Sequence, residues 1–205
     1  MRKVSKEAFM SAKKIISILG SVNKNSLSNK INNIVSSKLF KKYPNSEITL
    51  LDLANSPFSE LMLNGHDTTA FWEDSEAKSW ITKLKEADYV VINSPMINFN
   101  YSALVKNFID AICIADHSFS YKYSKKNGSV GLLNKMKVII IGTQGAPKGW
   151  YTFGDHVKML EGTFNFLGAK EVKTLLVAGT KVTPLKDMSQ EEIIKQYQKE
   201  IDALI

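Results

Sequence analysis

Cysteine, arginine, proline and long apolar runs are scarce in this chain of 205 residues. Cys113 is the only cysteine, which excludes an internal disulfide framework and a zinc site built from cysteines. No apolar run approaches the roughly 18 residues that a membrane-spanning helix needs. The 5 prolines and 11 glycines exclude a collagen-like chain. We therefore expect a protein of a reducing compartment, the cytoplasm, with no membrane partner.

Lysine supplies almost all of the positive charge. The 27 basic residues exceed the 20 acidic ones and give a net charge of +7, but Arg2 is the only arginine. Direct reading of base edges depends heavily on the planar guanidinium group. The lysines are scattered and often stand beside carboxylates, as on an ordinary solvated surface. We expect no nucleic-acid partner.

The N-terminal segment differs from the rest of the chain. Its sequence, MRKVSKEAFM, is basic but lacks the apolar core of a signal peptide. We expect residues 1–12 to be an N-terminal extension, either poorly ordered or produced by a start assigned upstream of Met10. The overall composition, 44% hydrophobic and 23% charged, is ordinary for a globular protein. Residues 13–205 are expected to form a single domain.

Short apolar runs rich in β-branched residues alternate with longer segments of helical periodicity. Strands that are apolar almost throughout are typical of a parallel sheet covered by helices on both faces. The pattern predicts an α/β fold with a five-stranded parallel sheet. The expected strands are 14–19, 47–53, 89–93, 137–142 and 171–178, and the expected helices are 27–40, 74–87, 101–115, 155–167 and 190–204.

Two longer connections interrupt this alternation. Residues 54–72 are expected to form a loop region. In residues 116–134, Tyr121 and Tyr123 alternate with polar residues, and Asn127-Gly128 is a turn signal. This second segment predicts an inserted hairpin or ordered flap, with an ordinary surface loop as the alternative.

The first strand is followed by the segment GSVNKNSLS at residues 20–28. Its hydroxyls and backbone N–H groups lie at a helix N-terminus, which favours binding of a phosphate. The segment matches neither the P-loop nor the dinucleotide-binding fingerprint, so its hydroxyls suit a phosphate monoester. The alternative is that Ser26 or Ser28 only caps the helix.

The third strand is followed by the segment NSPMINFNYS at residues 93–102. Pro95 turns the chain, Met96 and Phe99 supply apolar contact, and the amide groups can bond the polar edge of a flat heterocycle. The alternative is a turn followed by a helix cap at Asn100 or Ser102.

The fourth strand is followed by GTQGA at residues 142–146, where the glycines let the backbone approach a ligand closely. In an open parallel sheet, ligands bind beyond the carboxyl ends of the strands. The three segments are therefore expected to meet in one site.

The histidines and the cysteine carry no separate chemistry in this interpretation. His66, His117 and His156 lack metal-ligand spacing and are expected to be surface or loop residues, so no metal site is predicted. Cys113 is expected to be a core residue of a helix rather than a nucleophile.

The three segments together resemble the FMN-dependent NADH-azoreductases, which are flavodoxin-like NAD(P)H:quinone reductases. PMINFN at residues 95–100 is similar to the PMYNFN signature of that family. Further similarity lies in SLSN at 26–29, FSYK at 119–122, TQGA at 143–146 and the order of the strands. The resemblance covers residues 13–204 and implies a flavodoxin-like fold, tightly bound FMN and NADH as electron donor.

The resemblance also implies a role for each loop: one holds the FMN phosphate, one lines the ring, and one contacts its pyrimidine side. The implied cofactor-binding residues are Ser21, Ser26, Leu27, Ser28, Pro95, Met96, Ile97, Asn98, Phe99, Thr143, Gln144, Gly145 and Ala146. A wall of the substrate pocket is implied for Phe119, Tyr121 and Phe166. Ile97 stands where the family commonly has tyrosine, and Gln144 where it commonly has arginine.

The implied activity is transfer of two electrons from NADH to quinones and aromatic azo compounds by a ping-pong mechanism. FMN would carry the chemistry without a side chain as acid or base, and N–H groups at 97–99 would bond the ring. A homodimer with shared active sites is expected, because the ring needs a walled slot. The alternatives are a one-electron flavodoxin-type carrier, which would be shorter and acidic, and a non-catalytic FMN-binding module.

Overall fold

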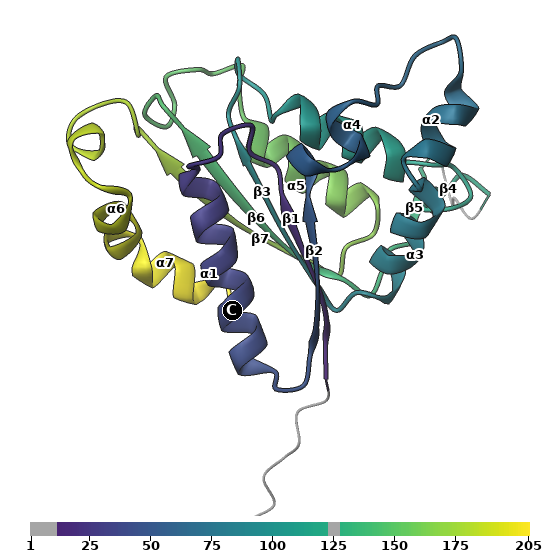
Figure 1. The fold of residues 1–205 in the computed structure, drawn as a ribbon, viewed down its shortest axis with the longest axis horizontal. Helices are drawn as coiled ribbons and strands as arrows, with labels where there is room; N and C mark the ends of the chain where they lie inside the picture. Colours follow the sequence, from purple (N-terminus) through teal and green to yellow (C-terminus); the bar gives the residue numbers. More distant parts are fainter. Residues whose placement is uncertain (1–11, 123–127) are drawn as a thin grey trace, which may run out of the picture.

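Five parallel strands form the central sheet of the computed structural model, which describes residues 12–122 and 128–205 (Figure 1). The order of the strands across the sheet is β2-β1-β3-β6-β7. Their bounds are Lys14–Leu19 for β1, Glu47–Asp52 for β2, Tyr89–Pro95 for β3, Lys137–Gln144 for β6 and Glu171–Ala178 for β7. The predicted five-stranded parallel sheet is confirmed.

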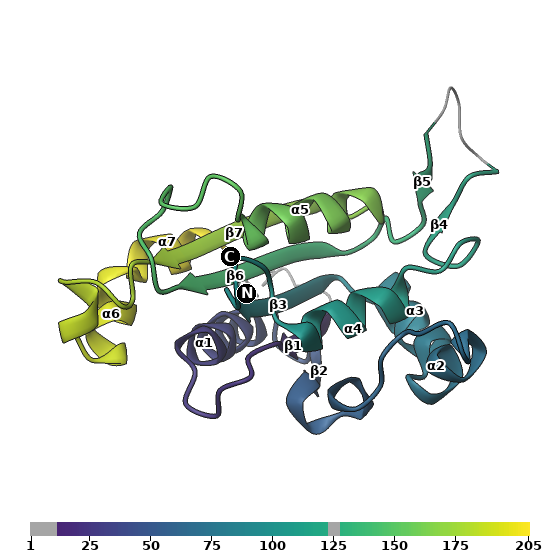
Figure 2. The ribbon, with the colours of Figure 1, turned by 90° about the horizontal axis from the view of Figure 1, so that it is seen from above.

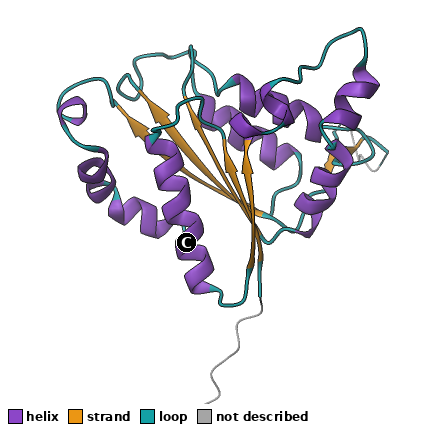
Figure 3. Cartoon of the chain, viewed as in Figure 1, coloured by secondary structure: helices purple, strands orange, loops and turns teal. Residues whose placement is uncertain are grey.

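Helices cover both faces of this sheet (Figures 1 and 3). In Figure 1, α1, α6 and α7 lie to the left of the sheet, while α3, α4 and α5 lie to its right. The helix bounds are Leu27–Lys42 for α1, Thr68–Asp74 for α2, Ala77–Glu86 for α3, Ala103–Ile112 for α4, His156–Phe166 for α5, Gln190–Gln196 for α6 and Gln198–Ala203 for α7. Three short 3-10 helices complete the connections: Leu53–Asn55, Pro57–Ser59 and Leu185–Asp187.

The alternation of side chains along each strand divides the core into two layers. Ile15 of β1 packs in the layer of α1, α6 and α7, whereas Ile16 packs in the layer of α3, α4 and α5. Val91 and Val90 of β3 divide in the same way. Strands β1, β3 and β6 are buried on both faces and are apolar almost throughout, as the sequence pattern indicated, whereas the edge strand β2 leaves Ile48 and Leu50 exposed.

Several predicted boundaries were wrong. The expected helix 74–87 is two helices, because the backbone at Glu76 is left-handed (φ 52°) and separates α2 from α3. The expected closing helix is broken at Tyr197, between α6 and α7. The expected loop 54–72 contains short helical turns and the start of α2. Strands β3 and β6 each extend two residues further than expected, to Pro95 and Gln144.

A two-stranded antiparallel hairpin projects from one end of the domain (Figure 2). Its strands are Phe119–Ser120 (β4) and Val130–Gly131 (β5), which confirms the hairpin interpretation of this insert. Gly131 lies directly against the turn after α5, where an added Cβ would be 2.2 Å from the backbone nitrogen of Gly168. Tyr123 and Asn127, which contributed to the prediction, lie outside the described residues.

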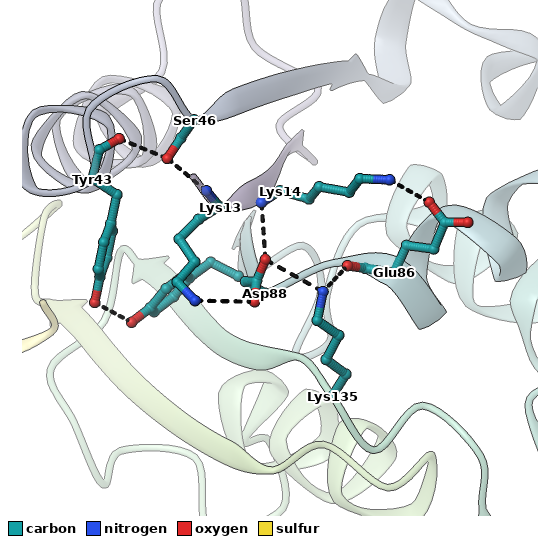
Figure 4. A network of polar contacts seen from close by, with 8 residues as sticks. Lys13, Lys14, Tyr43, Ser46, Glu86, Asp88 and Lys135 are labelled. Atoms are coloured by element: carbon teal, nitrogen blue, oxygen red, sulfur yellow. Dashed lines mark hydrogen bonds and ion pairs between the residues drawn. The ribbon is translucent and has the colours of Figure 1, made fainter. Parts of the chain in front are cut away.

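A polar network fixes the amino ends of the strands (Figure 4). The carboxylate of Asp88 accepts a hydrogen bond from the Lys14 backbone N–H at 3.0 Å and lies 3.5 Å and 3.4 Å from the ammonium groups of Lys13 and Lys135. Burial opposes ionisation of Asp88, but these donors outweigh it and hold the pKa of Asp88 below its usual value. The network therefore ties β1, β3 and β6 together at the edge opposite their carboxyl ends.

The prediction for residues 1–12 falls outside the described residues, apart from Ala12. Within residues 12–122 and 128–205, no helix has the length and apolar character needed to cross a bilayer.

Candidate active site

Four loops meet at the carboxyl ends of β1, β3, β6 and β7, along the upper edge of the sheet in Figure 1. The chain leaves β1 toward β2 on one side, and β3 lies on the other side of β1. This reversal of strand order opens a crevice between the loops that follow β1 and β3. Three of these loops were predicted from their sequences, whereas the fourth, residues 179–189, was not.

The loop after β1 ends in a capped helix. Ser26 is the N-cap of α1, and its Oγ accepts a hydrogen bond from the Asn29 N–H at 3.3 Å. The N–H groups of residues 24–28 have no acceptor among the described residues. The predicted cap is therefore present together with unused donors, so the two interpretations of this segment do not exclude each other.

Buried amides support this loop from below. Asn93, at the end of β3, donates to the Ser28 Oγ at 3.0 Å and to the Asn29 Oδ1 at 2.8 Å. Asn32 of α1 donates to the Asn93 Oδ1 at 3.0 Å and to the backbone oxygen of Ile18 at 3.0 Å. These bonds fix the start of α1 against the ends of β1 and β3.

The loop after β3 contains a tight turn with strained backbone. Ile97 and Asn100 exchange backbone hydrogen bonds of 2.7 Å and 3.1 Å around Asn98 and Phe99, whose φ angles are 45° and 74°. Asparagine tolerates a positive φ, but the conformation is costly for phenylalanine and points to a functional constraint. The Ile97 N–H is used within the turn, which corrects its expected role toward a ring. The N–H groups of Asn98 and Phe99 have no acceptor among the described residues.

The loops after β6 and β7 are joined to each other. Gly179 N–H donates to the Ala146 oxygen at 2.8 Å, and Lys181 N–H donates to the Gly145 oxygen at 3.0 Å. The Gln144 side chain turns back and donates to the oxygens of Ala146 and Pro147 at 3.0 Å and 3.2 Å. The fourth loop is therefore part of the site.

Two cavities lie between these loops. The first has a volume of about 330 Å³ and extends from Ser21, Ser26 and Leu27 to residues 95–97 and 143–145. The second, of about 390 Å³, is lined by Met96, Asn98, Phe99, Gly145, Ala146, Trp150, Tyr151, Lys181 and Val182. Met96, Gly145 and Lys181 line both.

The cavities bring together twelve of the thirteen cofactor-binding residues expected from sequence. The exception is Ser28, which is fully buried beneath the first cavity. Neither lining includes an aspartate or a glutamate, whereas Lys181 and Lys186 both line the first cavity. The site is therefore electropositive and suited to an anion.

The expected pocket wall lies elsewhere in the chain. Phe119 contacts Tyr121 and Phe166, with ring centroids 5.4 Å and 4.9 Å apart, and none of the three lines either cavity. Phe166 is the last residue of α5, whereas the first, His156, lies against Gly142 at the end of β6. The length of α5, about 15 Å, separates the two places.

His156 corrects a further expectation, because it is fully buried rather than a surface or loop residue. Its two ring nitrogens have no hydrogen-bond partner of normal geometry among the described residues. Burial holds the pKa of His156 below its usual value, and the nearby Ser94 backbone offsets this only in part. Cys113 is half-buried at the end of α4, and burial raises its pKa to about 11, as expected for an unreactive thiol.

A family model described as a flavodoxin-like fold matches residues 13–204. The chain is 42% identical over 164 residues to the FMN-dependent NADH:quinone oxidoreductase of Mycoplasmopsis synoviae, covering 80% of this chain and 82% of that protein. It is 41% identical over 196 residues to that of Mycoplasma mobile, covering 94% and 96%. The chain belongs to the flavodoxin-like family of FMN-dependent NADH:quinone oxidoreductases.

Solved structures of other proteins share the fold of this NADH:quinone oxidoreductase family member. An FMN-dependent NADH-azoreductase from Bacillus anthracis str. Ames Ancestor, solved in complex with FMN, is 24% identical with a TM-score of 0.70 and covers 93% of this chain and 97% of its own. An azoreductase from Bacillus anthracis str. Sterne is 23% identical with a TM-score of 0.74 and covers 92% and 96%. The resemblance read from PMINFN and its accompanying motifs is confirmed, together with the flavodoxin-like fold.

The buried His156 predicts a pH dependence of stability for this oxidoreductase family member. Its pKa is lowered in the folded state, so the unfolded chain binds more protons below pH 6.5 and stability is lost as pH falls. We expect the free energy of unfolding to fall more steeply below pH 6.5 in the natural chain than in His156→Leu. The difference approaches about 1.4 kcal/mol per pH unit.

Urea unfolding from pH 7.5 to pH 5 measures this difference in slope. His66→Leu is the matched control, because His66 is exposed and its loss should leave the slope unchanged. Equal slopes for His156→Leu and the natural chain would contradict the prediction.

Proposed function

We propose that this chain binds FMN in the first cavity and transfers two electrons from NADH to a quinone, with aromatic azo compounds as a second class of acceptor. The observation that supports the proposal is that two cavities of different character lie side by side. An electropositive cavity with unused backbone donors adjoins an aromatic hollow of about 390 Å³, and Met96, Gly145 and Lys181 line both. A phosphate ester with a flat ring fits the first, and planar substrates fit the second.

The phosphate would lie at the start of α1. The unused N–H groups of residues 24–28 and the hydroxyls of Ser21 and Ser26 supply donors, and the helix dipole favours a negative charge there. Lys186 adds a positive charge to the same cavity. Ser28 acts indirectly, since its hydroxyl lies beneath the cavity between Asn93 and Ser26.

The ring would lie between the turn at 96–99 and the loop at 143–146. The strained turn leaves the N–H groups of Asn98 and Phe99 available to the polar atoms of the ring. Gly145 carries no side chain on the surface that the two cavities share. These residues position and polarise the cofactor without acting as acids or bases.

Bound between these residues, FMN would supply the transfer of two electrons from NADH to the quinone, with one proton from the hydride of NADH and one from water completing the quinol. The net change is oxidation of NADH to NAD⁺ and reduction of the quinone to a quinol. The second cavity offers an aromatic-lined space beside Met96 and Gly145, where donor and acceptor would bind in turn. This shared space supports a ping-pong mechanism.

A one-electron carrier fits the structure less well. Such a protein needs only an exposed ring edge, whereas Trp150 and Tyr151 line a hollow beside the ring site. A non-catalytic FMN module would bind the cofactor equally well, so turnover is the deciding test.

Steady-state oxidation of NADH with menadione tests the proposal. We expect FMN-loaded protein to give parallel lines in double-reciprocal plots over a grid of both substrates. Intersecting lines would contradict the shared hollow, and bound FMN without turnover would establish a non-catalytic module.

Ser26→Asp is a matched variant for the cofactor site. Aspartate preserves the N-cap of α1, but it places a like charge beside the phosphate. We expect FMN affinity to fall at least about ten-fold with an unchanged fold. Ser37→Asp, on the exposed side of α1, should bind FMN with the affinity of the natural chain. Normal binding by Ser26→Asp would place the phosphate elsewhere.

We also propose a homodimer, which two exposed aromatic groups at opposite ends of α5 support. Tyr121 and Phe166 are 66% and 42% exposed at one end, and Trp150 and Phe153 are 63% and 74% exposed at the other. A two-fold axis would place the first group of each subunit against the second group of its partner and bury both. Phe119, Tyr121 and Phe166 would then wall the active site of the partner subunit.

Sedimentation of the natural chain at micromolar concentration is expected to show a dimer. Tyr121→Ala should weaken the dimer and lower quinone turnover, because truncation of an aromatic hot spot at an interface costs about 2 kcal/mol or more. Phe40→Ala removes an aromatic that is 45% exposed on α1 and serves as control. A fully active monomer would refute the shared site.

A further inference from the structure

We infer that Lys181 is the cation of the flavin-ring site and tunes the reduction potential of bound FMN. The inference rests on the FMN site proposed above. Lys181 lies in the loop after β7, which carries no part of the PMINFN or phosphate-binding segments. It is the only charged residue that lines both cavities at their junction with Met96 and Gly145.

Backbone hydrogen bonds hold Lys181 beside the ring loop. Its N–H donates to the Gly145 oxygen at 3.0 Å, and the Thr180 N–H donates to the Gln144 oxygen at 3.1 Å. The Thr180 hydroxyl donates to the same Gln144 oxygen at 3.1 Å. The position is therefore set by two loops that are bonded together.

The side chain of Lys181 runs across Gly145. An added Cβ at Gly145 would lie 3.1 Å from both Cγ and Cδ of Lys181, so the glycine gives room for the lysine stem. The apolar stem therefore packs over the ring loop, while the residue as a whole is exposed and its charged end stays accessible.

No other group competes for this charge. Lys181 has no ion pair with a carboxylate in the described part of the chain, and neither cavity is lined by an acidic residue. Gln144, the side chain expected near the pyrimidine side, is neutral and donates to Ala146 and Pro147 instead. The positive charge at this end of the ring site is therefore that of Lys181.

A cation here has a specific chemical consequence. Two-electron reduction of FMN with uptake of one proton leaves a negative charge on the pyrimidine side of the ring. Sulfite addition does the same: its sulfur forms a bond to N5, and the displaced electron pair moves to the pyrimidine side. Lys181 should favour both products over oxidised FMN, because it attracts the negative charge that they share.

The experiment measures sulfite affinity and midpoint potential with FMN bound, so turnover is not the readout. Lys181→Met keeps an unbranched stem but removes the charge. We expect sulfite binding to weaken about ten-fold and the potential to fall by about 30 mV, the equivalent of a ten-fold change for two electrons. Lys181→Arg should retain both properties.

Two further variants separate this role from general charge effects. Lys41→Met removes an exposed charge at the far end of α1 and should change neither property. Lys186 lines only the first cavity. Lys186→Met should therefore weaken FMN binding and leave the midpoint potential of the bound flavin nearly unchanged.

Unchanged sulfite affinity and potential in FMN-loaded Lys181→Met would overturn the inference. A higher KM for NADH with unchanged sulfite affinity would also overturn it, by assigning the ammonium group to the dinucleotide. Failure of the natural chain to bind FMN in this site would instead refute the proposed function.

Discussion

The pairing of two buried asparagines, Asn32 and Asn93, positions the rest of the site. Both are fully buried, and an amide without partners in such a place would be costly. Asn32 also accepts hydrogen bonds from Ser17 at 2.7 Å and Ser36 at 3.2 Å. A satisfied network of this kind permits one arrangement of α1 against β1 and β3. Asn25, Ser26 and Leu27, whose N–H groups have no acceptor among the described residues, line the first cavity directly above this network.

The charge distribution gives this geometry its chemical preference. The net charge of +7 is spread over the surface and by itself indicates no ligand. At the site, however, lysines occur without carboxylates: Lys186 lines the first cavity, and Lys181 stands at the junction of both. An anionic phosphate and a ring that becomes negative on reduction suit these two positions.

The sequence predicted the sheet and three site loops because both depend on local pattern. Apolar runs identify buried strands, and parallel strands bring their carboxyl ends to one edge. The fourth loop was missed because it has no motif, and only its hydrogen bonds to residues 144–146 show its role. The burial of His156 could have been predicted, since it shares a helical face with Leu160, Phe164 and Leu167.

Other features depend on tertiary contacts that sequence pattern does not contain. The break between α2 and α3 lies at Glu76, whose backbone is left-handed. Glutamate is not a turn residue such as glycine or asparagine, so no turn signal in the sequence marks this break. The position of Phe166 at the far end of α5 follows from the direction of that helix across the sheet. Phe166 is therefore too far from the flavin site of its own subunit, and its expected place beside a flavin ring fits only the site of a partner subunit in the proposed dimer.

Titration of the apoprotein of Asn93→Leu with FMN tests the central claim most directly. Leucine keeps the branched heavy-atom skeleton of asparagine but cannot form hydrogen bonds to Asn32, Ser28 or Asn29. The account predicts FMN affinity at least about ten-fold weaker than that of the natural chain, with the α/β fold retained by circular dichroism. Ser36→Ala, which removes a bond to Asn32 away from the cavities, should bind FMN nearly normally. Natural affinity in a folded Asn93→Leu protein would contradict the account.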